Sequence, residues 1–253
     1  RLLIKGGGDP TFSLDDLGGL VKKIRSKGID EISEGIYFDL SFFKQRKKNT
    51  GSFDKSPLRP YNTMHSALIV NSNKLDLKFS FTPEQKKLDV SPVFLPDGVI
   101  IQNNLSIGEG NCSDFRSQVS FRERYRKKLL TIVIEGVYPS QCLEKDHDLA
   151  ITKTEHYFFG AFKKLWLESG GKINGYFKKH NQNSRDILIA EILSDDLSGA
   201  IRFMLKESDN LTARNIFLSL GFESNRKEHR LMRRLSYESM KKNKIHWHYS
   251  NFI

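Results

Sequence analysis

The spacing of apolar residues changes twice along this chain, which restricts the folds that it can adopt. Residues 1–66 have the pattern of strand, turn, helix and strand, whereas 67–150 alternate with the period of two that is typical of β-strands. From residue 151 the helical period of 3.6 returns. The sequence therefore predicts a multi-domain α/β protein with domains at 1–66, 67–150 and 151–253, the middle one rich in β structure.

Several elements can be placed within these blocks. A helix is predicted after Ser13, because Ser13 and Asp16 have the spacing of a capping box and apolar residues then recur at helical intervals. Strict alternation predicts a strand over 75–81, and helical spacing predicts a second helix over 157–169 that ends at two glycines. A short apolar run favours a buried strand over 187–193.

A polar interruption at 206–210 separates two further helical patterns. The apolar positions before it, with Ser194 as a candidate N-cap, are Leu197, Ala200, Ile201, Met204 and Leu205, and those after it are Ala213, Ile216, Phe217 and Leu220. Two core-facing helices are expected to meet there, bringing together the hydroxyl of Ser208, the carboxylate of Asp209 and the amide of Asn210. Ser208 is either the N-cap of the second helix or part of a chemical site.

Composition and charge limit the class of protein. With 38% hydrophobic and 28% charged residues among 253, the chain is globular, and it contains no apolar run long enough to span a membrane. The net charge of +11 and the basic stretches 116–128 and 222–253 suit a module that binds nucleic acid or an envelope polyanion. No nucleic-acid-binding motif accompanies these stretches, so we expect no nucleic-acid partner and keep the basic binding module as the alternative.

Two other patterns suggest ligands but are explained more simply. Gly6-Gly7-Gly8 follows a predicted strand, yet it lacks the spacing of a phosphate-binding loop, so a turn is expected. His246 and His248 are two residues apart with no cysteine or carboxylate cluster nearby, which is poor spacing for zinc. We therefore predict no metal and no organic cofactor.

Three segments in order resemble one family. Ser-Asp-Asn at 208–210 is one of the three motifs that penicillin-binding proteins share with class A β-lactamases. The Gly-Gly-Gly-Asp-Pro run at 6–10 and the Arg-Pro-Tyr-Asn run at 59–62 precede it. Together they resemble the D-alanyl-D-alanine carboxypeptidases of the class C low-molecular-mass penicillin-binding proteins. The resemblance implies that 1–66 and 67–150 are inserted domains and that 151–253 is part of the catalytic domain.

The resemblance also implies a function. The implied function is that of a serine-type D-Ala-D-Ala carboxypeptidase or endopeptidase. Such an enzyme acts on peptidoglycan stem peptides through an acyl-enzyme and is inhibited by β-lactams. Ser208 would relay a proton to the departing amine, Asn210 would hydrogen-bond the substrate backbone, and Asp209 would face away. The family uses no cofactor and is exported, so a periplasmic location is expected.

The other two motifs of the family are expected to lie outside this sequence. Ser-x-x-Lys strings begin at Ser41, Ser52, Ser224 and Ser239, but none has the position of the nucleophile motif. The run 153–155 is Lys-Thr-Glu instead of Lys-Thr-Gly, and it precedes Ser208 instead of following it. We therefore expect a fragment of a longer enzyme that lacks its nucleophile and is inactive alone.

The two cysteines bracket a predicted β-hairpin. Val119, Phe121 and Tyr125 share one parity and three arginines share the other, and the chain returns through an apolar strand. From the residues alone, Cys112 and Cys142 are either reduced or bridged. The resemblance implies an oxidising compartment and pairing of these positions, so a disulfide is expected.

Overall fold

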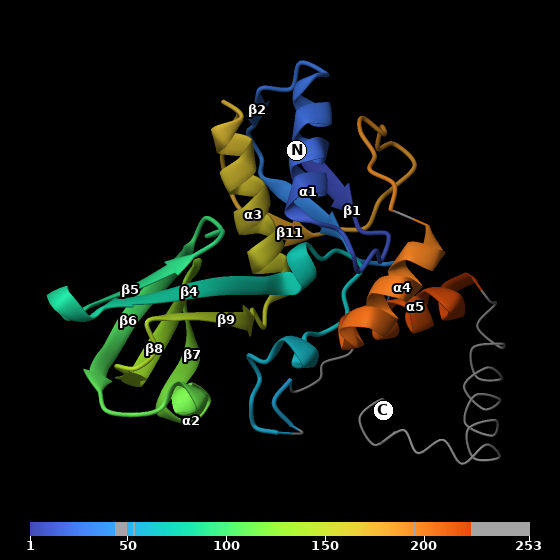
Figure 1. Ribbon diagram of the computed structural model, residues 1–253. Coiled ribbons are helices and arrows are strands. Elements are labelled where there is room, and N and C mark those ends of the chain that lie inside the picture. Colours follow the sequence, from blue (N-terminus) through green and yellow to red (C-terminus); the bar gives the residue numbers. More distant parts are fainter. Residues whose placement is uncertain (44–49, 53, 195, 224–253) are drawn as a thin grey trace, which may run out of the picture.

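The computed structural model describes residues 1–43, 50–52, 54–194 and 196–223. It confirms the mixed α/β class, because helices and four small sheets occur along the same chain (Figure 1). One lobe is built around two short parallel sheets and the helices α1 and α3, and a second lobe consists of two packed three-stranded sheets. Helices α4 and α5 lie on the opposite side of the first lobe from this β-rich lobe (Figure 1).

The first lobe joins strands from both ends of the described chain. Its larger sheet has the order β1-β3-β11, and its smaller sheet pairs β10 with β2, all in parallel. The strand bounds are β1 Leu2–Lys5, β2 Glu31–Ile32, β3 Ile36–Asp39, β10 Lys172–Ile173 and β11 Phe177–Lys179. The three-domain division remains a prediction, and the sheets show that blocks 1–66 and 151–253 contribute strands to common sheets.

Two helices pack beside these sheets. Helix α1 (Leu14–Arg25) begins with the predicted capping box, in which the Ser13 hydroxyl accepts from the Asp16 backbone N–H and the Asp16 carboxylate accepts in return. Helix α3 (Thr154–Glu168) covers the predicted second helix and contacts α1. Both helices confirm the positions expected from periodicity. Helix α1 buries one apolar face, whereas α3 is buried on all sides over residues 157–162.

The second lobe is the β-rich segment predicted for 67–150. One sheet has the order β5-β4-β9 and the other β6-β8-β7. The bounds are β4 Lys74–Thr82, β5 Lys87–Pro92, β6 Val99–Gly108, β7 Val119–Arg126, β8 Leu129–Pro139 and β9 Glu144–Ala150. The short helical turns are α2 Phe115–Gln118, η1 Pro60–Asn62, η2 Asn71–Asn73, η3 Pro83–Gln85 and η4 Cys112–Asp114. The stacked rings of Phe79 and Tyr138 lie at its centre, with Phe115 edge-on to both.

The predicted hairpin and its disulfide are both present. Strand β7 pairs antiparallel with β8, and its arginines alternate with partly buried Phe121 and Tyr125 as expected. Cys112 and Cys142 form a disulfide with their Cα atoms 5.0 Å apart. The bond therefore ties the chain before β7 to the chain after β8.

Three local expectations from the sequence are wrong. Residues 187–193 form no strand, and Ile187 and Leu193 are 86% and 78% exposed. The N-cap of α4 (Leu197–Glu207) is Asp196, whose carboxylate accepts from the Gly199 N–H at 2.8 Å, and not Ser194. Helix α4 forms, but its apolar face is not core-facing, since Leu205 is 70% exposed. Periodicity predicts the helix but not whether another surface covers it.

Across the described ranges, none of the helices combines the length and hydropathy that crossing a bilayer requires.

Candidate active site

The Ser-Asp-Asn tripeptide forms the junction between α4 and α5 (Asn210–Glu223). Ser208 ends α4 in the left-handed conformation, with a φ of 51°, and its N–H bonds the Met204 carbonyl. Asp209 begins α5, because its carboxylate accepts from the Thr212 N–H at 2.6 Å. The sequence suggested Ser208 as a possible N-cap, and the structure corrects this: Asp209 caps the helix and Ser208 closes the preceding one.

This division of roles leaves two polar side chains available for chemistry. Ser208 and Asn210 are exposed, and neither side chain has a hydrogen-bond partner within the described part of the chain. The left-handed conformation of a serine costs about 1 kcal/mol, so the turn is held by its surroundings. The carboxylate of Asp209, in contrast, is used by its own helix.

The N-terminal half of α5 is fixed to the first lobe by two polar side chains. Asn215 is 0% exposed, and its Nδ2 donates to the carbonyl oxygens of Gly8 at 3.1 Å and Ser66 at 3.3 Å. Arg214 donates from Nη1 to the Thr63 carbonyl oxygen at 2.9 Å, and burial lowers the pKa of its guanidinium. These bonds set the position of the helix that begins at the Ser-Asp-Asn junction.

The glycine run is the surface that receives this helix. The Gly6 N–H bonds the Asp39 carbonyl at 3.0 Å and the Gly8 N–H bonds the Ala67 carbonyl at 2.8 Å. A Cβ on Gly6 would lie 2.2 Å from the Ala67 oxygen, and Gly8 has a φ of +83°. The run is therefore a turn in close contact with residues 66–68, in agreement with the turn interpretation.

Sequence reasoning missed Arg214 and Asn215. The apolar spacing pointed to Ala213, Ile216, Phe217 and Leu220 as the core face of α5, and this expectation is wrong, because Phe217 and Leu220 are 43% and 48% exposed. The residues that are buried between 210 and 220 are Leu211, Thr212 and Asn215, a largely polar set that apolar periodicity does not detect. The buried atoms Thr63 Oγ1, Thr212 Oγ1 and Asn215 Oδ1 have no partner among the described residues. The contact between α5 and the first lobe is thus polar and only partly satisfied.

The remaining sequence candidates do not join this site. Ser41 lies in a turn after β3 and Ser52 lies in a loop turn, so neither is helical. Ser224, Ser239 and the pair His246 and His248 lie outside the described residues. The part of the chain that the structure describes contains no group of three His, Cys, Asp or Glu side chains that could hold a metal ion.

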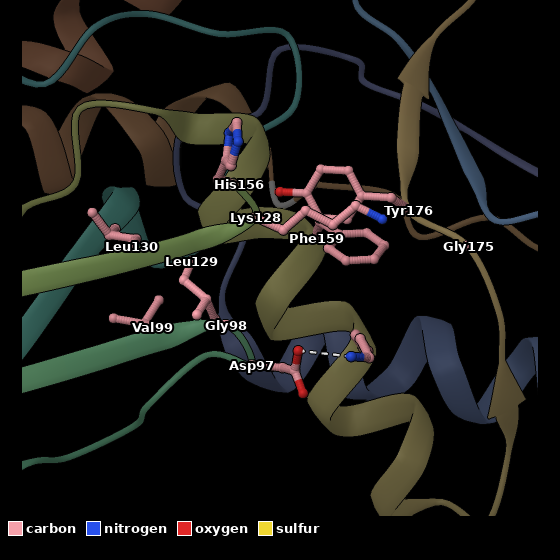
Figure 2. A pocket seen from close by; sticks show the side chains of 11 residues that line it. Asp97, Gly98, Val99, Lys128, Leu129, Leu130, His156, Phe159, Gly175 and Tyr176 are labelled. Carbon is pink, nitrogen blue, oxygen red and sulfur yellow. Dashed lines mark hydrogen bonds and ion pairs between the residues drawn. The ribbon is translucent and has the colours of Figure 1, made fainter. Parts of the chain in front are cut away.

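A separate cavity lies between α3 and the β7–β8 turn (Figure 2). It has a volume of about 280 Å³, and its walls include Lys128, His156, Phe159 and Tyr176. Lys163 also lines the cavity and forms an ion pair with Asp97 at 2.8 Å. None of the lining residues belongs to α4 or α5, so the cavity is distinct from the Ser-Asp-Asn junction.

The comparisons with known proteins agree with one another. Residues 1–238 match the model of the D-Ala-D-Ala carboxypeptidase 3 (S13) family. The chain is 22% identical over 226 residues to the D-alanyl-D-alanine carboxypeptidase DacB of Haemophilus influenzae, which covers 88% of this chain and 46% of that protein.

Two solved structures are also similar to this fold. The crystal structure of penicillin binding protein 4 (dacB) from Haemophilus influenzae has a TM-score of 0.68 at 18% identity, covering 87% of this chain and 48% of that one. The same protein complexed with a novel beta-lactam has a TM-score of 0.59 at 17% identity, with coverages of 85% and 45%. The likeness supports the fold, and the chain spans about half the length of these relatives.

Proposed function

This chain belongs to the D-Ala-D-Ala carboxypeptidase 3 (S13) family, and from that membership we propose that it is part of a serine-type D-Ala-D-Ala carboxypeptidase. The substrate class would be the stem peptides of peptidoglycan, cleaved through an acyl-enzyme, with carboxypeptidase or endopeptidase specificity. β-Lactams would be its inhibitors, as a relative with a similar fold is described as complexed with one.

The observation that carries this proposal is the geometry of the Ser-Asp-Asn junction. Capping a helix requires one side chain, and here Asp209 caps α5. Capping of α5 therefore does not account for Ser208 and Asn210. The hydroxyl of Ser208 and the amide of Asn210 remain exposed beside it. The junction thus presents one group that can transfer a proton and one that can both donate and accept hydrogen bonds.

These two groups suit the step of acyl transfer in which the leaving amine departs. A serine oxygen attacks the peptide carbonyl carbon, and the tetrahedral intermediate then expels the D-Ala amine, which must gain a proton as the C–N bond breaks. Ser208 would pass that proton to the amine, and water would later hydrolyse the acyl ester. Asn210 would hold the substrate backbone through its amide.

We place the nucleophile outside these 253 residues. In a Ser-x-x-Lys motif the two side chains meet because residues three apart share a helix face. Ser41 and Ser52 are not in helices, which supports their exclusion. The third motif would likewise lie outside, since the Thr at 154 and the Glu at 155 belong to the first turn of α3.

An exported, periplasmic location is the proposal that fits the disulfide. Disulfides form and persist in oxidising compartments, and Cys112 and Cys142 are bridged. The similar protein DacB is named as a D-alanyl-D-alanine carboxypeptidase, and the stem peptides proposed here as substrate lie outside the cytoplasm. The positive charge would also attract the chain to an anionic envelope.

The test is the release of D-alanine from a peptide that ends in D-Ala-D-Ala by the full-length protein. We expect release at a rate that benzylpenicillin abolishes in parallel with covalent labelling. The labelled peptide should contain a Ser-x-x-Lys serine that is absent from the sequence 1–253. Absence of both release and labelling would leave the alternative of a basic binding module, for which the exposed arginines of β7 are the supporting feature.

A further inference from the structure

The sheet β6-β8-β7, drawn in green tones in Figure 1, packs by one face into the β-rich lobe and leaves the other face open. Phe121 and Tyr125 of β7 and Ile132 of β8 pack in the hydrophobic core. Side chains alternate along a strand, so the residues between these point to the opposite side. We call that side the open face, and it consists of Ser120, Arg122, Arg124 and Arg126 from β7, Leu129, Thr131, Val133, Glu135 and Val137 from β8, and Ile100, Gln102, Asn104 and Ser106 from β6.

The open face carries unbalanced positive charge along β7. Arg122 forms an ion pair with Glu135, the acidic residue among those that make up this face. Arg124 and Arg126 are exposed, as is Lys127 in the turn that follows, and none of the three has an ion pair with another described residue. Two guanidinium groups and one ammonium group are therefore available to an anionic partner.

The spacing of these charges suits an extended partner. Alternate residues of a strand are about 7 Å apart, so the three arginines of β7 form a row about 14 Å long at one edge of the open face. Each guanidinium can donate two parallel hydrogen bonds to a carboxylate. At the end of the row, a hollow that could receive a further anionic group is lined by Arg126, Lys127, Lys128 and Leu129.

The side chains beside the row favour an acidic peptide over a phosphate polymer. Gln102 and Asn104 of β6 present amide groups, which can both donate to and accept from peptide bonds. Ile100 and Leu129 are 46% and 47% exposed and offer apolar surface to small side chains such as alanine. Strand β6 is two strands from β7, so these groups lie about 10 Å from the arginines.

A stem peptide of peptidoglycan has this chemistry. Its amino end is joined to the glycan by an amide, whereas its D-Ala end keeps a free carboxylate wherever it is not cross-linked. Neighbouring stem peptides therefore present several carboxylates on one polymer. The disulfide Cys112–Cys142 favours an oxidising compartment, and this supports a polymer of the cell envelope over nucleic acid.

We propose that the open face is a docking surface for peptidoglycan, on which Arg124, Arg126 and Lys127 bind the free carboxylates of neighbouring stem peptides. The choice of polymer rests on the proposed function. Exposed ion pairs are weak one at a time, so tight binding requires several carboxylates on the same polymer. The surface thus recognises the polymer and not a single stem peptide.

The test measures how much of the full-length protein sediments with purified, insoluble peptidoglycan. The comparison is the same material after carbodiimide and methylamine have converted its carboxylates to methylamides, which removes the charge and keeps the polymer. We expect the dissociation constant to rise at least about tenfold on amidation, because several ion pairs are lost together. This comparison uses the wild-type protein and needs no variant.

A pair of variants locates the surface. The double variant Arg124→Gln, Arg126→Gln should bind native peptidoglycan at least about tenfold more weakly than the wild type. The matched control is Lys78→Gln, Lys86→Gln, which removes the same charge from exposed positions on β4 and in the turn after it. The control should bind within about twofold of the wild type, and thermal melts show that both variants fold.

Several results would overturn the proposal. They are equal binding of native and amidated peptidoglycan, an unchanged affinity in the arginine variant, or an equal loss in the lysine control, which would mean that net charge alone acts. Phosphatidylglycerol vesicles or single-stranded DNA that bind as tightly as peptidoglycan, and through the same arginines, would overturn the choice of partner. Sedimentation does not depend on catalysis. Docking as expected without D-alanine release would refute the proposed function alone, and release without docking would refute the surface alone.

Discussion

Replacement of Asn215 by leucine should separate stability from chemistry at the Ser-Asp-Asn junction. Asn215 is 0% exposed and donates to the carbonyl oxygens of Gly8 and Ser66, which accept no other hydrogen bond in the described structure. Leucine has the same branched shape and is larger, so the change removes two donors without opening a cavity, and any overpacking adds to the loss of stability. Both carbonyl oxygens would be left buried and unpaired.

The magnitude follows from counting unpaired atoms. A buried acceptor without a partner costs about 1–3 kcal/mol, so two of them cost about 2–6 kcal/mol. The wild-type Asn215 already has an unpaired Oδ1, whose removal returns about 1–2 kcal/mol. We therefore expect Asn215→Leu to lower the free energy of unfolding by about 1–4 kcal/mol.

Urea unfolding followed by circular dichroism measures this loss in the full-length protein. Asn210→Ala is the matched control on the same helix, because Asn210 is exposed, and its unfolding free energy should change by less than about 0.5 kcal/mol. A loss below about 1 kcal/mol for Asn215→Leu would mean that α5 is not held to the first lobe by this side chain.

Three further predictions concern the disulfide, a half-buried histidine and the two serines that were excluded as nucleophiles. Reduction of the Cys112–Cys142 bond, which closes a loop with a sequence separation of 30, should lower the free energy of unfolding by about 3–4 kcal/mol, and unchanged urea midpoints with and without reductant would contradict this. Burial lowers the pKa of His147 from 6.5 to about 4. As the pH falls, His147 is therefore protonated in the unfolded chain at a higher pH than in the folded protein, which favours unfolding. The free energy of unfolding should fall by about 1 kcal/mol from pH 7 to pH 5 after allowance for solvent screening. His147→Gln should remove that part of the pH dependence, and an unchanged slope would show that other groups cause it. Ser41→Ala and Ser52→Ala should leave labelling of the full-length protein by penicillin unchanged, whereas loss of labelling in either would identify a nucleophile that we excluded.

Elements with short-range causes were predictable from the sequence. Helix α1 follows from Ser13, Asp16 and the apolar spacing after them, and the β7–β8 hairpin follows from alternation on both sides of a turn. In both, the residues that determine the structure are close neighbours in the chain.

Elements with distant causes were not predictable. The partners of Asn215, Gly8 and Ser66, precede it by 207 and 149 residues, so no local pattern shows that α5 docks there. A strand at 187–193 would need a neighbouring strand, and residues 187–193 pair with none in the described structure, which no local pattern reveals. The tripeptide 208–210 could be located from the sequence, but the capping role of Asp209 depends on backbone geometry that residue types alone do not fix.

The central claim is that Ser208 and Asn210 take part in acyl transfer. The most direct measurement is the turnover of a D-Ala-D-Ala peptide by the full-length Ser208→Ala protein beside its thermal melt. The account predicts turnover lower by about 10²- to 10⁴-fold with the melting temperature nearly unchanged, since Asp209 and not Ser208 caps α5. Full turnover in the variant would contradict it, and the junction would then be only a connection between two helices.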